Sequence, residues 1–129
     1  MPFGGCLRFS SMEALRLILE RGSLSGAGDE LDASVEILDL RSLKPLDEEA
    51  LLASAAKTGR VVLVQEAPRT CGYAAELAAI LAEKALLDLR APILRVTGYD
   101  VPYPYWTIED AYMPSVARVV DAARRLLEF

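Results

Sequence analysis

The sequence predicts an α/β protein in which a mostly parallel sheet lies between two layers of helices. Two observations support this fold class. Short apolar runs rich in valine, isoleucine and leucine alternate with longer segments whose apolar residues recur at helical spacing. Each short run leads through a turn or cap residue into a helical segment, which is the order of parallel strands joined by helical crossovers. We therefore expect a three-layer α/β/α sandwich with a sheet of about four to five strands.

The expected elements follow one another from the first apolar run to the C-terminus. Four apolar runs predict strands at Leu7–Phe9, Val35–Leu40, Arg60–Gln65 and Ile93–Thr97. Cap, stop and periodicity signals predict four helices: one begun by Ser10 or Ser11 and ended by Gly22, one capped by Asp47 and ended near Gly59, one from Tyr73 to about Leu89, and one opened by Pro114 and Ser115. Two segments predict loops: a flexible, glycine-rich insertion at Ser23–Ser34 and an irregular aromatic loop at Asp100–Pro114.

Size and composition limit the classes of function. The chain has 129 residues, of which 53% are hydrophobic, and this suits one domain with its own core over residues 1–129. A net charge of −5, with both signs interspersed, disfavours nucleic-acid binding, which needs a positive patch. No apolar run approaches the roughly 20 residues of a membrane span. The N-terminus does not resemble a signal peptide, and Cys6 and Cys71 do not make a disulfide framework, so we expect a cytoplasmic protein.

The chain contains no histidine. The commonest general base and the commonest metal ligand are therefore missing. A Ser-His-Asp or Cys-His catalytic site cannot be assembled from these residues, and a transition-metal site is not expected from two distant cysteines. Neither Gly4-Gly5 nor Gly26-Ala27-Gly28 has the strand–loop–helix setting of a phosphate-binding loop.

The segment that joins the third strand to the third helix places several reactive side chains close together. Glu66, Arg69 and Cys71 lie near the carboxyl end of a strand, where open α/β sheets place their binding surfaces. Glu66 could line a cleft, or it could pair with Arg69 or with loop amides. Cys71 could be made reactive by the following helix N-terminus, or it could be a small residue that fits a tight site. For both residues the structural role is the favoured interpretation.

The loop at Asp100–Pro114 contains the aromatic residues Tyr103, Tyr105 and Trp106 among prolines. Prolines stiffen the backbone, and tyrosine and tryptophan offer large contact areas with a polar tip. The loop could fold over the protein's own core, or it could form a contact with another protein. We favour the protein contact.

A series of short motifs over residues 35–129 resembles a known family. In chain order these motifs are Val35–Asp47, Thr58–Val64, Glu66–Thr70, Ala75–Glu76, Ala91–Pro92, Arg95–Gly98, Asp100–Pro102, Pro104–Tyr105 and Met113–Ser115. They resemble the C-terminal domain of the E1 β subunit of thiamine-diphosphate-dependent 2-oxoacid dehydrogenases, a domain shared with transketolases. The resemblance implies a sheet with one antiparallel edge strand, in which the first strand lies between the second and the third. The switch point would then lie near Ser10, Ser11 and Glu66.

The resemblance also implies a role in assembly. In the parent enzyme, thiamine diphosphate and Mg²⁺ bind outside this domain, between the α subunit and the N-terminal domain of β. The C-terminal domain packs subunits together, and the implied interface residues are Glu66, Arg69, Tyr103, Tyr105 and Trp106. In the pyruvate branch it also contacts the acyltransferase (E2), through Phe129 and through position 90. Many relatives carry an acid at that position, where this chain has Arg90; alternatively, Arg90 caps the third helix. The Gly-Gly usual after Arg-Thr is Cys71-Gly72 here.

Three hypotheses follow from the sequence. The first is a non-catalytic assembly domain of an E1 β subunit, of pyruvate or branched-chain type, or of a split transketolase-like enzyme. It would bind no cofactor, form oligomers and be inactive alone. The second is a small-molecule-binding module that uses the crevice near Ser10, Ser11 and Glu66, together with Arg69. The third is a fragment without a present role. The residues that select the substrate lie outside this domain in the family.

Overall fold

The computed structural model describes residues 6–7 and 33–129 of the chain. The predicted helix that begins after Ser10 or Ser11, and most of the predicted insertion, lie outside the described residues. The strands are β1 (Cys6–Leu7), β2 (Ser34–Val35), β3 (Val62–Pro68) and β4 (Leu94–Gly98). The helices are α3 (Glu48–Thr58), α4 (Tyr73–Lys84), α5 (Glu109–Tyr112) and α6 (Val116–Leu127), with 3₁₀ turns η1 (Leu86–Asp88) and η2 (Trp106–Ile108).

The strands pair in parallel, as predicted, but in two separate pairs. β1 pairs with β2, and β3 pairs with β4 so that Val62 lies opposite Leu94 and Val64 opposite Val96. The four described strands therefore form two two-stranded sheets rather than the predicted continuous sheet of four to five strands, and none of the described strands runs antiparallel. The predicted order also placed the first strand next to the third. That pairing is not among the pairs of the described residues, in which the first strand ends at Leu7.

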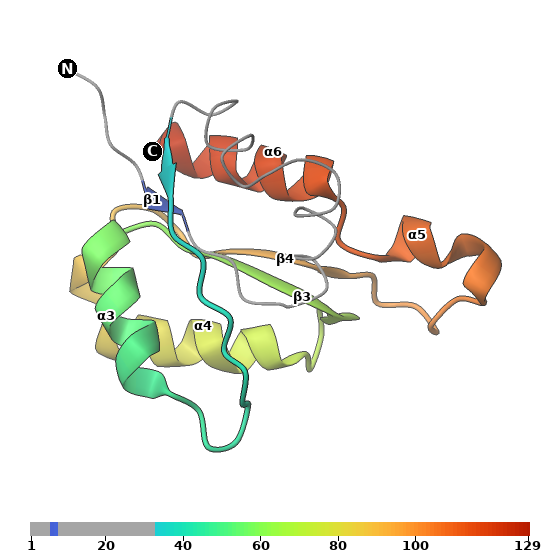
Figure 1. Cartoon of the computed structure of the whole chain (residues 1–129), viewed down its shortest axis with the longest axis horizontal. Helices are drawn as coiled ribbons and strands as arrows, with labels where there is room; N and C mark the ends of the chain where they lie inside the picture. Colours follow the sequence, from blue (N-terminus) through green and yellow to red (C-terminus); the bar gives the residue numbers. More distant parts are fainter. Residues whose placement is uncertain (1–5, 8–32) are drawn as a thin grey trace.

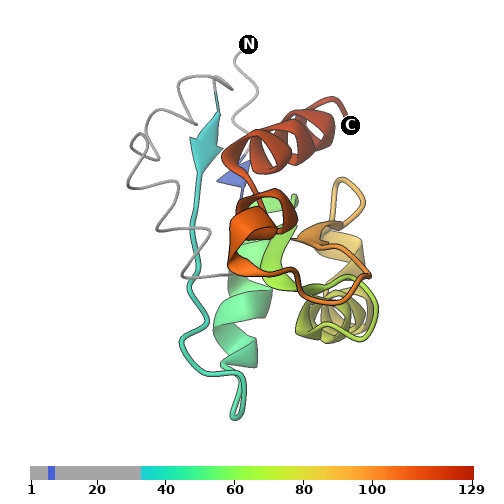
Figure 2. The ribbon, with the colours of Figure 1, turned by 90° about the vertical axis from the view of Figure 1, so that its right-hand side faces the viewer.

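The third strand separates two helical layers, and its alternating side chains show why. Val61 and Leu63 pack in a cluster with α3 and α4, whereas Val62 and Val64 pack against α6. Successive side chains of a strand point to opposite faces, so one continuous valine-rich run supplies both halves of the core. Figures 1 and 2 show α6 on one side of β3 and β4, and α3 and α4 on the other. Each fully buried leucine or valine contributes roughly 1.5–3 kcal/mol.

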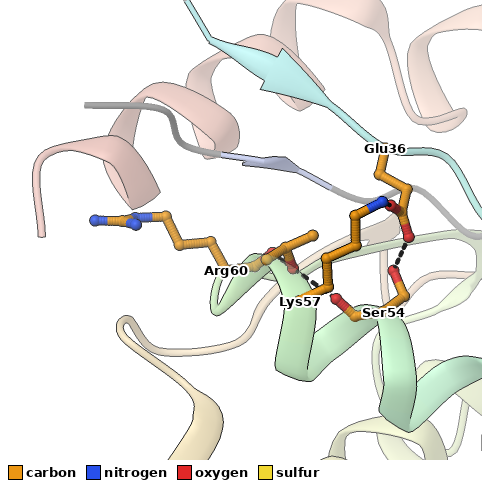
Figure 3. Close-up of polar contacts among 5 residues, drawn as sticks. Glu36, Ser54, Lys57 and Arg60 are labelled. Carbon is orange, nitrogen blue, oxygen red and sulfur yellow. Dashed lines mark hydrogen bonds and ion pairs between the residues drawn. The ribbon is translucent and has the colours of Figure 1, made fainter. Parts of the chain in front are cut away.

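The second predicted strand, Val35–Leu40, is wrong over most of its length. Strand pairing includes Ser34 and Val35, and residues 36–40 follow without a strand partner. The apolar alternation here reflects burial instead, because Ile37 packs against the α6 cluster and Leu40 against the α3–α4 cluster. Polar side chains fix the segment: Ser54 and Lys57 of α3 both donate to the carboxylate of Glu36 (Figure 3). The loop predicted at Ser23–Ser34 included one residue too many at its C-terminal end, since Ser34 belongs to β2.

Helix ends follow local signals where a cap residue is present. Asp47 accepts a hydrogen bond from the Ala50 N–H at 2.9 Å, and Gly59 closes α3 in the left-handed region at φ 67°. Ser115 caps α6 as predicted. The third helix was predicted to reach about Leu89, but α4 ends at Lys84 and η1 follows. The tighter turn brings Leu89 back to the core and leads the chain toward β4.

Candidate functional site

The carboxyl ends of β3 and β4 lie side by side, and the predicted site residues of the third strand lie there. Glu66 lies within β3 rather than after it, because the strand continues to Pro68. It is half-buried. Arg69 follows the strand and donates to the Arg95 carbonyl oxygen at 3.3 Å, and Arg95 donates back to the Arg69 carbonyl oxygen at 3.2 Å. This reciprocal pair fastens the loop after β3 to β4.

A second fastening joins the loops that follow the two strands. Thr70 donates from its backbone N–H to one oxygen of Asp100 and from its hydroxyl to the other, both at 2.8 Å. These two hydrogen bonds, the backbone one first, hold the pKa of the Asp100 carboxyl below its usual value. Asp100 was predicted only as a loop residue. An aspartate at the start of a loop often accepts hydrogen bonds from backbone N–H groups, and this signal could have indicated that Asp100 binds the loop after β3.

Gln65 is the residue that the sequence analysis missed most clearly. Its side-chain oxygen accepts from the Ala74 N–H at 2.6 Å, so it caps α4, for which Gly72 offers no side chain. Its amide nitrogen donates to the Pro68 carbonyl oxygen at 2.9 Å and to that of Ala67 at 3.3 Å. Glycine suits position 72, because a Cβ there would lie 2.4 Å from the Pro68 carbonyl oxygen, a backbone atom that cannot easily move. The side-chain amide of Gln65 thereby links the end of β3, the turn after it and the start of α4.

Cys71 completes this turn in a left-handed conformation. Its φ is 58°, in the region that favours glycine, and its thiol is free and exposed. The structural role favoured from the sequence stays a prediction. Exposure of a lone thiol does not by itself indicate chemistry.

The aromatic segment, defined here as residues 99–113, is more ordered than predicted. It was expected to be an irregular loop, but it contains η2 and α5. Tyr112 of α5 is buried and packs edge-on against Tyr99 at 6.3 Å and Tyr103 at 5.0 Å between ring centroids. The Tyr103 hydroxyl donates to Glu109, and that hydrogen bond is the main cause that raises the pKa of Tyr103 to about 12. Tyr103 is thus partly fixed on its own domain.

Three large side chains of this segment, two aromatic and one aliphatic, face solvent. Tyr105 is 87% exposed, Trp106 83% and Ile108 60%. The segment projects from the rest of the molecule at the carboxyl end of β4 (Figure 1). Contiguous exposed apolar side chains of this size mark contact surfaces more often than isolated ones do. Ile108 belongs to this surface, although the sequence analysis did not name it.

Arg90 and Phe129 lie at the opposite end of the strands. The Arg90 N–H donates to the Gly59 carbonyl oxygen at 2.7 Å, and Arg60 donates through Nε to the Leu126 carbonyl oxygen at 2.8 Å. These bonds bring the ends of α3 and α6 to the amino ends of β3 and β4. The stem of Arg90 lies over Gly59 at the end of α3. Phe129 is 71% exposed.

A basic cleft of about 270 Å³ runs along β4 and α6. Its lining includes one carboxylate, Asp121, and four arginines: Arg69, Arg95, Arg118 and Arg125. The sequence analysis named only Arg69 among them. The spacing of Arg118, Asp121 and Arg125 on one helix face is a signal that could have indicated the cleft.

Neither a metal cluster nor a membrane-spanning helix is found among the described residues. In residues 6–7 and 33–129, no three acidic or cysteine side chains lie close enough together to hold a metal ion. None of the helices in that part of the chain is long and apolar enough to cross a bilayer. Ser10 and Ser11 of the predicted crevice lie outside the described residues.

Comparisons with known proteins identify the family. The model of the family described as "Transketolase, C-terminal domain" matches residues 26–119. The chain belongs to this family. The resemblance inferred from the motifs is thereby confirmed, and so is the C-terminal position of this domain in such enzymes.

Relatives with high identity are β subunits of 2-oxoacid dehydrogenases. The chain is 52% identical over 102 residues to the 2-oxoisovalerate dehydrogenase subunit beta of Pseudomonas aeruginosa, a match that covers 79% of this chain and 29% of that protein. It is 45% identical over 106 residues to the pyruvate dehydrogenase E1 component subunit beta of Staphylococcus epidermidis, covering 80% and 33%. The chain therefore spans about a third of the length of these curated relatives.

A solved structure supports the fold. The chain of a split-gene transketolase, described as an inactive β4 tetramer, superposes with a TM-score of 0.72 at 26% identity. The match covers 96% of this chain and 38% of that one. The α/β fold class predicted from the sequence is confirmed by this likeness.

Proposed function

We propose that this chain is the assembly domain of a thiamine-diphosphate-dependent 2-oxoacid dehydrogenase or of a split transketolase-like enzyme. The observation that carries the proposal is the exposed aromatic surface of Tyr105, Trp106 and Ile108. The fold gives these side chains no internal use, and a partner subunit would cover them. The named relatives support this role, since they are subunits of larger enzymes.

The proposal assigns no catalytic step and no cofactor to this domain. Thiamine diphosphate and Mg²⁺ would bind to other parts of the parent enzyme, and the whole enzyme would act in the cytoplasm on a 2-oxoacid or a sugar phosphate. Glu66, Arg69 and Tyr103 would border the subunit contact. Arg69 and Tyr103 are already held by internal hydrogen bonds, so we expect them to shape the contact rather than to anchor it.

Sedimentation velocity over a range of concentrations tests the proposal directly. We expect dimers or larger oligomers, because the apolar surface is left uncovered in the monomer. The chain alone should show no 2-oxoacid decarboxylase or transketolase activity with added thiamine diphosphate and Mg²⁺. A clean monomer at high concentration, or activity of the chain alone, would contradict the proposal.

We further propose that Arg90 and Phe129 face an E2 partner in the parent complex. Both are exposed at the same end of the domain, away from the aromatic segment. If the E2 domain is basic, Arg90 weakens this contact and Arg90→Asp strengthens it, with a gain that fades as salt is raised. Titration of the wild type and of Arg90→Asp with a basic E2 peripheral domain measures this. If Arg90→Asp changes only the free energy of unfolding, Arg90 serves the packing over Gly59 alone.

A further inference from the structure

The basic cleft carries a local charge that opposes that of the whole chain. Its lining has four guanidinium groups and one carboxylate, whereas the chain has a net charge of −5. The ion pairs of the described residues join Arg41 to Asp39, Lys57 to Glu36 and Lys84 to Glu48, and none of them involves a cleft residue. The excess positive charge of the cleft is therefore not neutralised by these pairs. A concave surface with one sign of charge attracts ligands of the other sign.

Three of the four arginines are held in place by backbone carbonyl groups. Arg69 and Arg95 bind each other's carbonyl oxygens at 3.3 and 3.2 Å. Arg118 donates to the Thr97 carbonyl oxygen at 2.7 Å and lies 4.7 Å from the centroid of the Tyr99 ring. These neutral partners orient the guanidinium groups without cancelling their charge, and of the three Arg69 also interacts electrostatically with a carboxylate outside the cleft, that of Asp100. A guanidinium has five N–H donors, so most of them stay available to a ligand.

The carbonyl partners also explain why the arginines gather at this edge. The Leu94 N–H donates toward β3, to the Val61 carbonyl oxygen at 3.1 Å. Because successive backbone groups of a strand point to opposite sides, the carbonyl groups of Arg95 and Thr97 point away from β3. Two arginines cover them. The outer edge of β4 is thus occupied by side chains, and this disfavours addition of a further strand here.

We propose that this cleft binds a compact anion with phosphoryl groups. Guanidinium groups bind phosphate oxygens through paired N–H donors, and here they come from a loop, a strand and a helix. The cleft volume of about 270 Å³ lies just below the range of roughly 300–1,000 Å³ for drug-sized ligands, which favours a small anion over a peptide. Arg69 lines this cleft and also borders the proposed subunit contact, but Tyr105, Trp106 and Ile108 do not line the cleft, and the proposal does not depend on the assembly role.

Titration calorimetry of the 129-residue chain with inorganic diphosphate, at fixed ionic strength, tests the site. Arg125 has no hydrogen bond or ion pair to other described residues, so Arg125→Gln removes a ligand donor without removing a structural contact. We expect about tenfold weaker binding for this variant, from the loss of one charge-assisted hydrogen bond. Arg124→Gln is the matched control, because the neighbouring arginine is exposed and does not line the cleft. It should change the affinity less than twofold.

Asp121→Asn should have the opposite effect, since it removes the one carboxylate of the lining. We expect diphosphate to bind several-fold tighter to this variant, and thiamine diphosphate to bind wild type no tighter than inorganic diphosphate does. Equal weakening by Arg124→Gln and Arg125→Gln would overturn the proposal, because it would indicate a diffuse charge effect. So would the absence of binding at millimolar diphosphate, or binding of citrate as tight as that of diphosphate. An oligomeric state that matches or contradicts the assembly proposal leaves these outcomes unaffected.

Discussion

The loops that follow β3 and β4 begin side by side and have opposite characters. In the loop after β3, residues 69–72, the polar groups are used within the domain: Arg69 binds β4, Thr70 binds Asp100, and Gln65 holds the turn at Gly72. In the aromatic segment after β4, Tyr112 is buried, but Tyr105 and Trp106 are more than four-fifths exposed. The polar groups of the first loop are bound within the domain, whereas large apolar side chains of the second are left exposed.

This difference shows how to separate residues that stabilise the fold from residues that serve a partner. The loop after β3 offered the more reactive side chains in the sequence, but hydrogen bonds of Arg69, Thr70 and Gln65 hold this loop within the domain. The aromatic segment offered less chemistry, but its exposed apolar area is a cost that the isolated domain does not recover. Substitutions in the first loop should therefore change stability, and substitutions at the tip of the second should change association.

Gly98→Ala should have the largest effect, because Gly98 lies where the two loops meet. A Cβ there would lie 2.3 Å from the Glu66 carbonyl oxygen and 2.5 Å from the Tyr112 ring. Backbone cannot give way as a flexible side chain can, so we expect a loss of about 3 kcal/mol from the free energy of unfolding. Urea unfolding followed by far-ultraviolet circular dichroism measures it. Thr107→Ala, at an exposed position of the same segment, should stay within about 0.5 kcal/mol of wild type.

Gln65→Leu should have the next largest effect. The substitution removes the cap of α4 at the Ala74 N–H and the donation to the Pro68 carbonyl oxygen. We expect a loss of about 2 kcal/mol, measured by the same unfolding method. Gln65→Glu is the matched variant, because its carboxylate accepts from Ala74 but cannot donate to Pro68. A loss for Gln65→Glu as large as that for Gln65→Leu would show that the donation, and not the cap, holds the turn.

The sequence predicted the fold class and the helices with capping residues, because those depend on local signals. Asp47, Gly59 and Ser115 each act within a few residues of their own position. It failed at Val35–Leu40, where a strand-like pattern arose from packing on two clusters without a continuous backbone partner. Periodicity reports which side chains are buried, but it does not report which backbone groups find a neighbour.

The candidate site was predictable only in part, for the same reason. The aromatic residues were identified from composition; Tyr105 and Trp106 are exposed, whereas Tyr103 packs against Tyr112, and the protein contact stays a prediction. The cleft was not predicted, since it brings together residues that lie far apart in the sequence, from Arg69 to Arg125. The role of Gln65 likewise depends on a turn that returns the chain to the strand end.

Asp100→Asn should have a smaller effect that depends on pH. The folded state lowers the pKa of Asp100 below 3.8 through its two hydrogen bonds with Thr70. A lowered carboxyl pKa stabilises the folded state above the unfolded pKa, and this stabilisation is lost as the pH falls through the folded pKa. Wild type should therefore unfold at a higher temperature than Asp100→Asn at neutral pH, and the gap should close below about pH 4. A gap that persists at pH 2 would assign the effect to the amide's geometry rather than to charge.

Trp106→Ala should have the smallest effect on stability and a clear effect on association. The ring is 83% exposed, so its removal costs the monomer little, and we expect the free energy of unfolding to stay within about 0.5 kcal/mol of wild type. If Trp106 anchors a partner, its loss should shift the sedimentation profile toward the monomer, since aromatic anchors contribute about 2 kcal/mol or more to contacts. Leu87→Ala is the matched control: Leu87 is 98% exposed and lies in η1, outside the aromatic segment, so its loss should leave association unchanged. Unchanged association of Trp106→Ala would place the contact elsewhere. A loss of stability above about 1 kcal/mol would show that the ring serves the fold of the aromatic segment. That outcome would remove the contrast between the two loops.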